Sequence, residues 1–166
     1  MTQRDIVAIL CIALFVFLVS LAVRSLKKRS AGQPSLILRS AEDLTGDEVG
    51  EASGYYVSTT LTDAPLDRVA HRSLLHRGKA RLSVLTDGLV IDRTGEPSIA
   101  IHASELLSVG RASASIDRGV EANGLLAITW MSAANRLTTN LRLRSEDDSQ
   151  ELFATISKLA EKEAIA

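Results

Sequence analysis

One continuous apolar run near the N-terminus constrains this chain more than any other feature. Residues 6–23 read IVAILCIALFVFLVSLAV, which contains no charged residue and one hydroxyl-bearing residue, Ser20. These 18 residues would span roughly 27 Å as a helix, close to the ~30 Å hydrocarbon core of a bilayer. A soluble domain of this size has little room to bury a helix that is apolar on every side. The run therefore predicts a membrane-spanning helix in contact with the lipid bilayer.

The charges around the run predict whether it is cleaved and which way it points. A signal peptide carries positive charges before its apolar segment and a small-residue cleavage site after it. Here four basic residues follow the run, so we expect an uncleaved anchor. The positive-inside rule then predicts a single-pass protein of the plasma (inner) membrane, with residues 1–5 outside and the C-terminal part in the cytoplasm. The residues expected at the membrane surface are Arg24, Lys27, Lys28 and Arg29.

Composition limits what the rest of the 166-residue chain can be. Beyond the anchor and its flank, roughly 110–130 residues remain, the usual size of one domain. A net charge of −1 and an aromatic content of 4% argue against a nucleic-acid binder. The single cysteine, Cys11, lies within the apolar run, so an intrachain disulfide and a cysteine metal site are both excluded.

The charges of residues 24–53 indicate a basic flank followed by an acidic linker. Strand-like periodicity begins at residue 54. The linker contains SAGQPS, a short strand candidate LILRS, and the solvated loop AEDLTGDEVGEASG. A helical turn or short helix is expected over 64–78, and Asp87-Gly88 is a strong hairpin signal because both residues tolerate positive φ. Strands are expected in YYVSTTL, in the hairpin series KARLSVLTDGLVIDRTGEPSIAI, in ELLSVGRASASI, in LLAITWM with Trp130 in the core, and in LTTNLRLR.

The C-terminal segment EDDSQELFATISKLAEKEAIA changes to a helical period. Asp147 and Gln150 resemble a capping box, so the helix is expected to start near Asp148. Its apolar face holds Leu152, Phe153, Ile156, Leu159 and Ala160. The prediction is a mainly β domain: a seven-stranded half-open antiparallel barrel, capped by this C-terminal amphipathic helix.

This order of elements is that of a pleckstrin-homology (PH) fold. The segments LDRVAHRSLLHRGKARLSV, DGLVIDRTGEPSIAI, GLLAITW and LTTNLRLR resemble the PH-like domains of bacterial membrane proteins, particularly small single-pass proteins of actinobacteria. The resemblance covers about residues 55–161 and implies a PH-like domain over 54–163. One departure is RASASIDRGVEANG, where such proteins often carry a shorter, more glycine-rich turn. The resemblance supplies no catalytic residues.

The sequence contains no persuasive catalytic constellation, so we expect a non-enzymatic protein without metal or cofactor. His71 and His76 are five residues apart, which does not align two ligands on one helix face. The nucleophile-elbow, phosphate-loop and dinucleotide-binding glycine motifs are absent from the sequence.

The candidate binding residues form a basic stretch, for which several interpretations remain open. It could be a solvated rim, a site for anionic lipid headgroups, or a site for an acidic partner. The leading hypothesis is a membrane-anchored adaptor that binds a protein partner or itself. The alternatives are an anionic-lipid-binding module and an accessory subunit of a transport or envelope complex. The stretch comprises Arg68, Arg72, Arg77, Lys79 and Arg81.

Overall fold

The chain divides into two compact units, Met1–Pro34 and Ser35–Ala166. The first unit contains one helix, and the second contains the β-domain. The computed structural model describes the backbone of residues 3–31, 36–69, 71–112, 114–115, 118–119 and 124–165, with side chains for 10–24, 36–65, 68–69, 71, 73–112 and 124–162.

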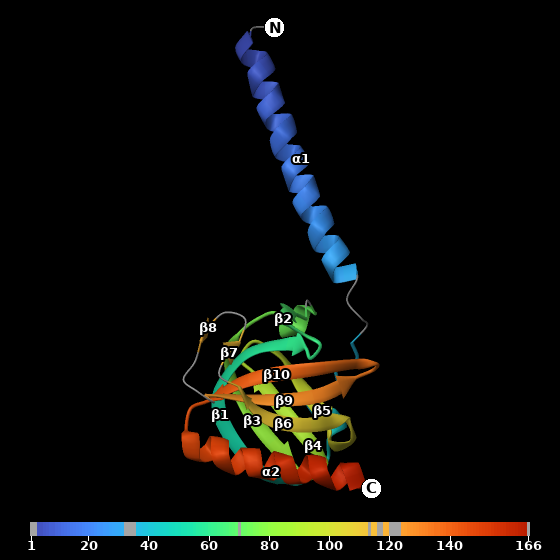
Figure 1. Ribbon diagram of the computed structural model, residues 1–166, viewed down its shortest axis with the longest axis vertical. Helices are drawn as coiled ribbons and strands as arrows, with labels where there is room; N and C mark the ends of the chain where they lie inside the picture. Colours follow the sequence, from blue (N-terminus) through green and yellow to red (C-terminus); the bar gives the residue numbers. More distant parts are fainter. Residues whose placement is uncertain are drawn as a thin grey trace. The chain divides into compact units, whose positions relative to one another are not determined.

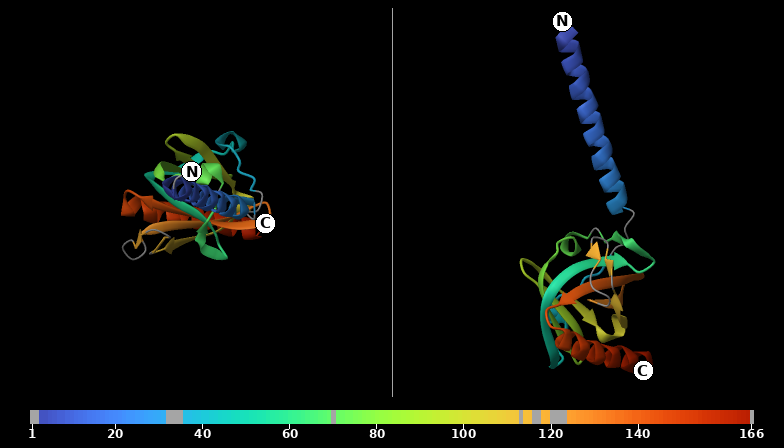
Figure 2. Two further views of the ribbon diagram at one scale, coloured as in Figure 1. Left: turned by 90° about the horizontal axis from the view of Figure 1, so that it is seen from above. Right: turned by 60° about the vertical axis from the view of Figure 1, so that its left-hand side comes forward.

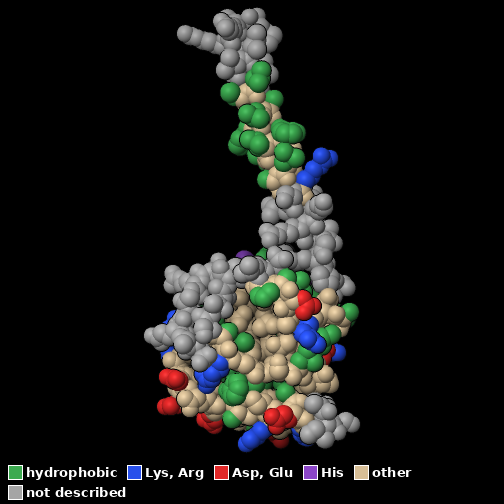
Figure 3. All heavy atoms as spheres, viewed as in Figure 1, with side chains coloured by type: hydrophobic (Ala, Val, Ile, Leu, Met, Phe, Trp, Pro, Cys, Tyr) green, Lys and Arg blue, Asp and Glu red, His purple; other side chains and the backbone are tan. Residues whose placement is uncertain are grey.

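Helix α1 (Gln3–Ala31) includes the whole predicted segment 6–23 and extends beyond it at both ends. Its described side chains are exposed, and Figure 3 shows hydrophobic groups covering this part of the helix. Among the residues whose side chains the structure describes, no helix is long and apolar enough to cross a membrane. Arg24 is exposed on α1, whereas the side chains of Lys27, Lys28 and Arg29 lie outside the described residues.

The second unit is built on one open antiparallel sheet, and the seven strands of its main path confirm the prediction of a mainly β domain. The strand order is β5-β4-β3-β1-β10-β9-β6, which makes β5 and β6 the two edges. Figures 1 and 2 show the strongly curved sheet, with a long C-terminal helix crossing one end. The seven strands are β1 (Glu48–Leu61), β3 (Gly78–Leu85), β4 (Gly88–Arg93), β5 (Glu96–His102), β6 (Leu106–Ala112), β9 (Leu125–Ser132) and β10 (Asn135–Leu143).

Strand β1 belongs to both halves of the curved sheet. Its residues 48–56 pair with β3, and its residues 54–61 pair with β10. Gly54 lies where the two pairings overlap, opposite Ala80 on one side and Leu143 on the other. A Cβ at this position would stand 2.3 Å from the carbonyl oxygen of Arg142, so the close approach of the strands requires glycine.

The main core lies between the sheet and α2 (Glu146–Ile165), as the amphipathic pattern predicts. Leu152 and Ile156 of α2 are buried in the same cluster as Trp130. The helix begins two residues before the expected Asp148, because the Ser145 hydroxyl accepts a hydrogen bond from the Asp148 N–H at 3.3 Å.

A line of buried polar groups crosses this core. Trp130 Nε1 donates to Thr139 Oγ1 at 3.0 Å, and the Thr139 and Thr59 hydroxyl oxygens lie 2.9 Å apart. The Tyr56 hydroxyl lies 2.8 Å from Thr59 Oγ1 and donates to the Leu74 carbonyl oxygen at 3.1 Å. The chain of contacts therefore ties the loop before β3 to the centre of the domain.

A second, smaller core lies on the outer face of the sheet. Val90 points away from the main core because its neighbours Leu89 and Ile91 point into it. Leu44 covers Val90 and is 7% exposed, although the sequence predicts a solvated loop here. The loop prediction is wrong over residues 41–44, where the 3₁₀ turn η1 (Ala41–Asp43) lies against β5, and from residue 48 onwards, where β1 begins.

The helical turn or short helix expected over 64–78 is present only as a single turn. The segment contains the short strand β2 (Ala64–Arg68), which pairs with β1, and a single 3₁₀ turn, η2 (Arg72–Leu74). The two-residue turn at 62–63 folds this segment back onto β1. Pairing with β1 therefore determines its structure, although the local spacing of apolar residues favours a helix. LILRS forms no strand and instead makes one isolated bridge, from Arg39 to Ala100.

Three further boundaries differ from the sequence expectation. The β3–β4 turn is Thr86-Asp87, and Gly88 is already paired in β4. Glycine is required at position 88 by close approach, since a Cβ would stand 2.3 Å from the Ile101 carbonyl oxygen. The strand expected over 105–116 begins after a 3₁₀ turn, η3 (Ala103–Glu105), and ends as β6 at Ala112. The following β7 (Ala114–Ser115) and β8 (Arg118–Gly119) form a separate small hairpin, and Ile116 lies outside the described residues.

Candidate functional site

The structure brings together only part of the predicted basic stretch. Lys79 and Arg81 alternate with buried Ala80 and Leu82, so both side chains lie on the outer face of β3. Arg68 lies on β2, where its Nη2 donates to the Val57 carbonyl oxygen at 3.0 Å. The remaining two are Arg77, which is exposed in the turn before β3, and Arg72, whose side chain lies outside the described residues.

Two rows of side chains cross the sheet beside Gly54. In the first row, Tyr55 on β1 pairs with Lys79 on β3 and with Arg142 on β10. In the second row, Ser53 pairs with Arg81, and its carbonyl oxygen accepts a hydrogen bond from the Arg144 N–H at 3.0 Å. Each row thus places a β1 residue between two basic residues. We call this surface the basic face: Ser53, Tyr55, Lys79, Arg81, Arg142 and Arg144.

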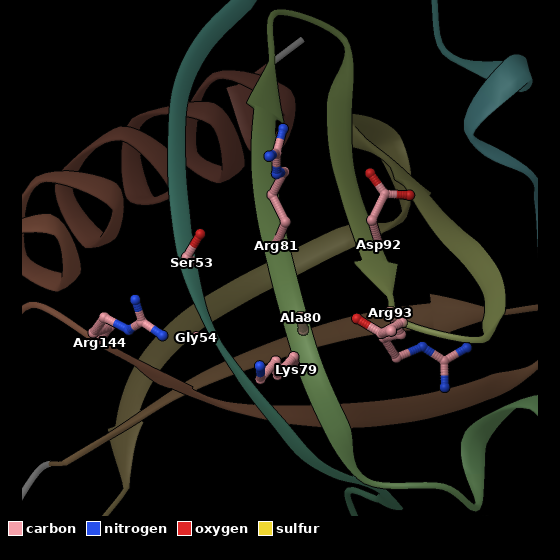
Figure 4. A pocket seen from close by; sticks show the side chains of 9 residues that line it. Ser53, Gly54, Lys79, Ala80, Arg81, Asp92, Arg93 and Arg144 are labelled. Atoms are coloured by element: carbon pink, nitrogen blue, oxygen red, sulfur yellow. The ribbon is translucent and has the colours of Figure 1, made fainter.

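A shallow pocket of about 370 Å³ opens on part of the basic face. Figure 4 shows that Lys79 and Arg81 reach it from β3 and that Arg144 reaches it from the residue after β10. Ser53 contributes a hydroxyl group, and Asp92 on the neighbouring strand β4 contributes the only carboxylate among the lining residues. The pocket can therefore offer several hydrogen-bond donors to an anionic group.

The cations of the basic face differ in how far they are neutralised. Arg81 Nη1 lies 3.3 Å from the Glu51 carboxylate, in an exposed ion pair. Among the described residues, none is in ion-pair range of Lys79, Arg142 or Arg144. Within the described part of the domain, these three positive charges are not neutralised by an ion pair.

Arg93 also lines the pocket, but its guanidinium group is engaged elsewhere. Figure 4 shows its side chain pointing away from Lys79 and Arg144. Nη1 donates to the Ser73 carbonyl oxygen, Nη2 donates to the Pro97 carbonyl oxygen at 2.9 Å, and the group lies 4.9 Å from the Tyr56 ring centroid. Burial lowers the pKa of Arg93, while the nearby Tyr56 and Glu96 raise it. Arg93 therefore stabilises the loops around the core.

Sequence reasoning missed Ser53, Tyr55, Arg142 and Arg144. The alternation of LTTNLRLR does place Arg142 and Arg144 on the polar side of their strand, and the spacing of Lys79 and Arg81 places them on one face of theirs. The missing information is that β1 pairs with both of these strands, which joins the two basic pairs into one surface.

The histidines do not form a comparable site. His71 Nδ1 lies 2.9 Å from the Ser73 hydroxyl, and His76 Nδ1 lies 3.7 Å from the Glu96 carboxylate. In the part of the chain that the structure describes, no group of three or more histidine, cysteine, aspartate or glutamate residues is arranged to hold a metal ion.

Comparison with known proteins identifies the family of the β-domain. A search of curated proteins returned no match. The family model described as bacterial PH domain-like matches residues 36–157, well over half of the chain. The matched region contains the seven strands of the main sheet path and most of α2. Together with the open antiparallel sheet and its C-terminal helix, this match shows that the chain belongs to the bacterial PH domain-like family.

Proposed function

We propose that this protein is a membrane-anchored, non-enzymatic adaptor whose basic face binds an acidic segment of a protein partner. A PH-like domain suggests a binding module, but a fold alone does not identify a ligand. The observation that carries the proposal is the set of three cations, Lys79, Arg142 and Arg144, that no described residue neutralises. Carboxylates supplied by a partner would satisfy these donors.

The surroundings of the basic face favour a discrete acidic segment over a broad anionic surface. Glu51 and Asp92 lie beside the cations, and exposed acidic residues begin two positions after Arg144 in the chain. An anionic bilayer would repel these carboxylates while it attracted the cations. A single acidic segment can contact the cations and avoid the neighbouring acids. Binding to anionic lipid is the alternative function.

The proposed anchor is the segment 6–23, with the N-terminus outside the plasma (inner) membrane and the domain in the cytoplasm. The uncharged run and the basic residues that follow it support this orientation. The segment extends beyond the part of α1 whose side chains are described. Anchoring would raise the effective concentration of the domain near other membrane proteins, so a modest intrinsic affinity would suffice.

The test compares proximity labelling by the full-length protein in living cells with labelling by charge-reversed variants. We expect Lys79→Glu with Arg144→Glu to lose specific neighbours that the unchanged protein labels. Arg136→Glu is the matched control, because Arg136 is exposed on the same strand, β10, outside the basic face. An unchanged set of neighbours in the double variant would refute the proposal.

A liposome experiment distinguishes the lipid alternative. The fragment 36–166, once shown to unfold cooperatively, would be sedimented with neutral and with anionic vesicles. The adaptor proposal predicts little binding to either. Strong binding to anionic vesicles that collapses between 0.1 M and 1 M salt, where the Debye length falls from ~10 Å to ~3 Å, would favour lipid recognition instead.

A further inference from the structure

An acidic surface adjoins the basic face in the chain itself. Only Ser145 separates Arg144 from Glu146, the first residue of α2. The first two turns of this helix carry the exposed acids Glu146, Asp147 and Glu151, together with the partly buried Asp148. We call the three exposed residues the acidic turns. Basic residues thus precede Ser145 in the chain, and acidic residues follow it.

The basic face and the acidic turns do not neutralise each other within one chain. The described residues include no ion pair between any of the three acids and Lys79, Arg142 or Arg144. Some of the acidic charge interacts favourably with the N-terminus of α2 through the helix dipole. That interaction does not involve the three cations of the sheet, which have no acidic ion-pair partner among the described residues.

We infer that the acidic segment bound by the basic face is the acidic turns of a second copy of this chain. In a two-fold symmetric interface, the surface of each copy must complement itself. A surface with adjacent positive and negative halves meets this requirement, because one rotation places each half against its opposite. Three available cations face three exposed acids, so the two halves match in charge.

The composition of the basic face suits such a contact. Tyr55 is 53% exposed and lies in the row between Lys79 and Arg142. Tyrosine is enriched at the centre of protein interfaces, where its ring adds apolar contact and its hydroxyl group stays hydrogen-bonded. Exposed ion pairs are individually weak and screened by salt. This inference rests on the proposed function, since a shared membrane would supply the effective concentration that such a contact needs.

The test uses the full-length protein in detergent at low salt and a zero-length carbodiimide cross-linker, which joins a lysine amine to a carboxylate. Lys79 and Glu146 are retained in every variant as the reporting pair. Mixing isotopically light and heavy protein distinguishes a bond between copies from a bond within one copy. We expect a cross-link between Lys79 of one copy and Glu146 of the other that diminishes as the salt concentration rises.

Charge exchange provides the decisive comparison. Variant one carries Arg142→Glu and Arg144→Glu, and variant two carries Asp147→Arg and Glu151→Arg. Each variant alone should give about tenfold less intermolecular cross-link, because attraction becomes repulsion in both halves of the interface. A mixture of the two variants should recover the cross-link between unlike copies, since both halves are again attractive. The control Arg136→Glu should behave as the unchanged protein does.

The outcomes separate this inference from the proposed function. Failure of the mixture to recover, or cross-links only within one copy, would overturn the second-copy inference, provided that thermal unfolding shows both variants folded. If the dimer never forms but Arg142→Glu with Arg144→Glu abolishes labelling of another protein in cells, the inference falls and the adaptor proposal stands. If the charge reversals change neither the cross-linking between copies nor the labelling of other proteins in cells, both the second-copy inference and the adaptor proposal are refuted.

Discussion

The buried chain of hydroxyl groups makes a directional prediction about stability. A phenol has one proton, and a carbonyl oxygen can only accept, so the Tyr56 proton goes to the Leu74 carbonyl oxygen at 3.1 Å. The Thr59 hydroxyl must then donate to the Tyr56 oxygen, and the Thr139 hydroxyl must donate to Thr59. Trp130 Nε1 donates to Thr139 at 3.0 Å and begins the chain. Every proton in this arrangement has one acceptor.

The substitution Thr139→Val keeps the shape of the side chain and removes the acceptor of Trp130. Because Trp130 is 1% exposed and Thr139 is 0% exposed, water cannot replace the lost oxygen without a rearrangement of the core. A buried unsatisfied donor costs about 1–3 kcal/mol, so we expect the free energy of unfolding to fall by that amount. Thr59→Val should also cost about 1–3 kcal/mol, because it removes the acceptor of the buried Thr139 hydroxyl, although Tyr56 keeps its bond to Leu74.

A double-mutant cycle in urea tests this order of protons. Trp130 is the only tryptophan of the chain, so its fluorescence reports unfolding of the fragment 36–166 directly. Thr59 and Thr139 share one hydrogen bond, so the double variant should cost about 0.5–1 kcal/mol less than the sum of the single variants. A Thr139→Val cost below about 0.5 kcal/mol, or strict additivity of the two substitutions, would refute the reasoning.

Three further predictions concern other parts of the domain. Gly54→Ala should cost about 1–3 kcal/mol in urea unfolding, because its Cβ would stand 2.3 Å from a backbone oxygen, whereas the control Gly78→Ala meets nothing within 4 Å and should cost far less. Burial raises the pKa of Tyr56 above 10.0, so at alkaline pH the folded chain retains a proton that the unfolded chain releases. The contribution of this group to stability should be complete below about pH 10 and should fall as the pH rises towards the folded pKa. Tyr56→Phe should flatten this alkaline slope of the free energy of unfolding. Leu44→Ala should cost about 2 kcal/mol and increase amide exchange or proteolysis selectively around residues 41–46, and unchanged protection there would contradict the second core.

The elements predicted correctly are those whose own residues carry the pattern. LTTNLRLR alternates over its whole length and forms most of β10, and LLAITWM forms β9 with Trp130 fully buried. The C-terminal helix was recognisable because its apolar residues recur at helical spacing. By contrast, the structure of the segment 64–78 is determined by its pairing with the adjacent strand β1. Leu44 is a single large apolar residue in a mostly polar stretch, so its burial gives no local pattern. Their structure depends on partners that are distant in sequence or on turn geometry.

The sequence predicted a basic candidate site, but it did not predict all of the residues that form it. Lys79 and Arg81 are close in sequence, so a local reading identified them. Arg142 and Arg144 lie more than 60 residues further along the chain and reach the same surface only because β1 pairs with both β3 and β10. A run of basic residues in the sequence also does not show which of them contact neutralising or hydrogen-bonding partners in the folded domain. Arg68 and Arg81 proved to have partners within the domain, whereas Lys79 has none among the described residues.

The contrast between the two parts of the outer sheet face bears on whether the basic face has a function. Around Val90 and Ala100, the outer face of β4 and β5 is apolar, and the segment containing Leu44 covers it. Around Gly54 the outer face is polar and carries the cations. Solubility alone would be served by interspersed charges of both signs, which also stabilise one another locally. Here the cations Arg142 and Arg144 lie before Ser145, and the acids begin immediately after it. Among the described residues, such segregation leaves Lys79, Arg142 and Arg144 and the acidic turns without ion-pair partners, and an interface between chains would supply them.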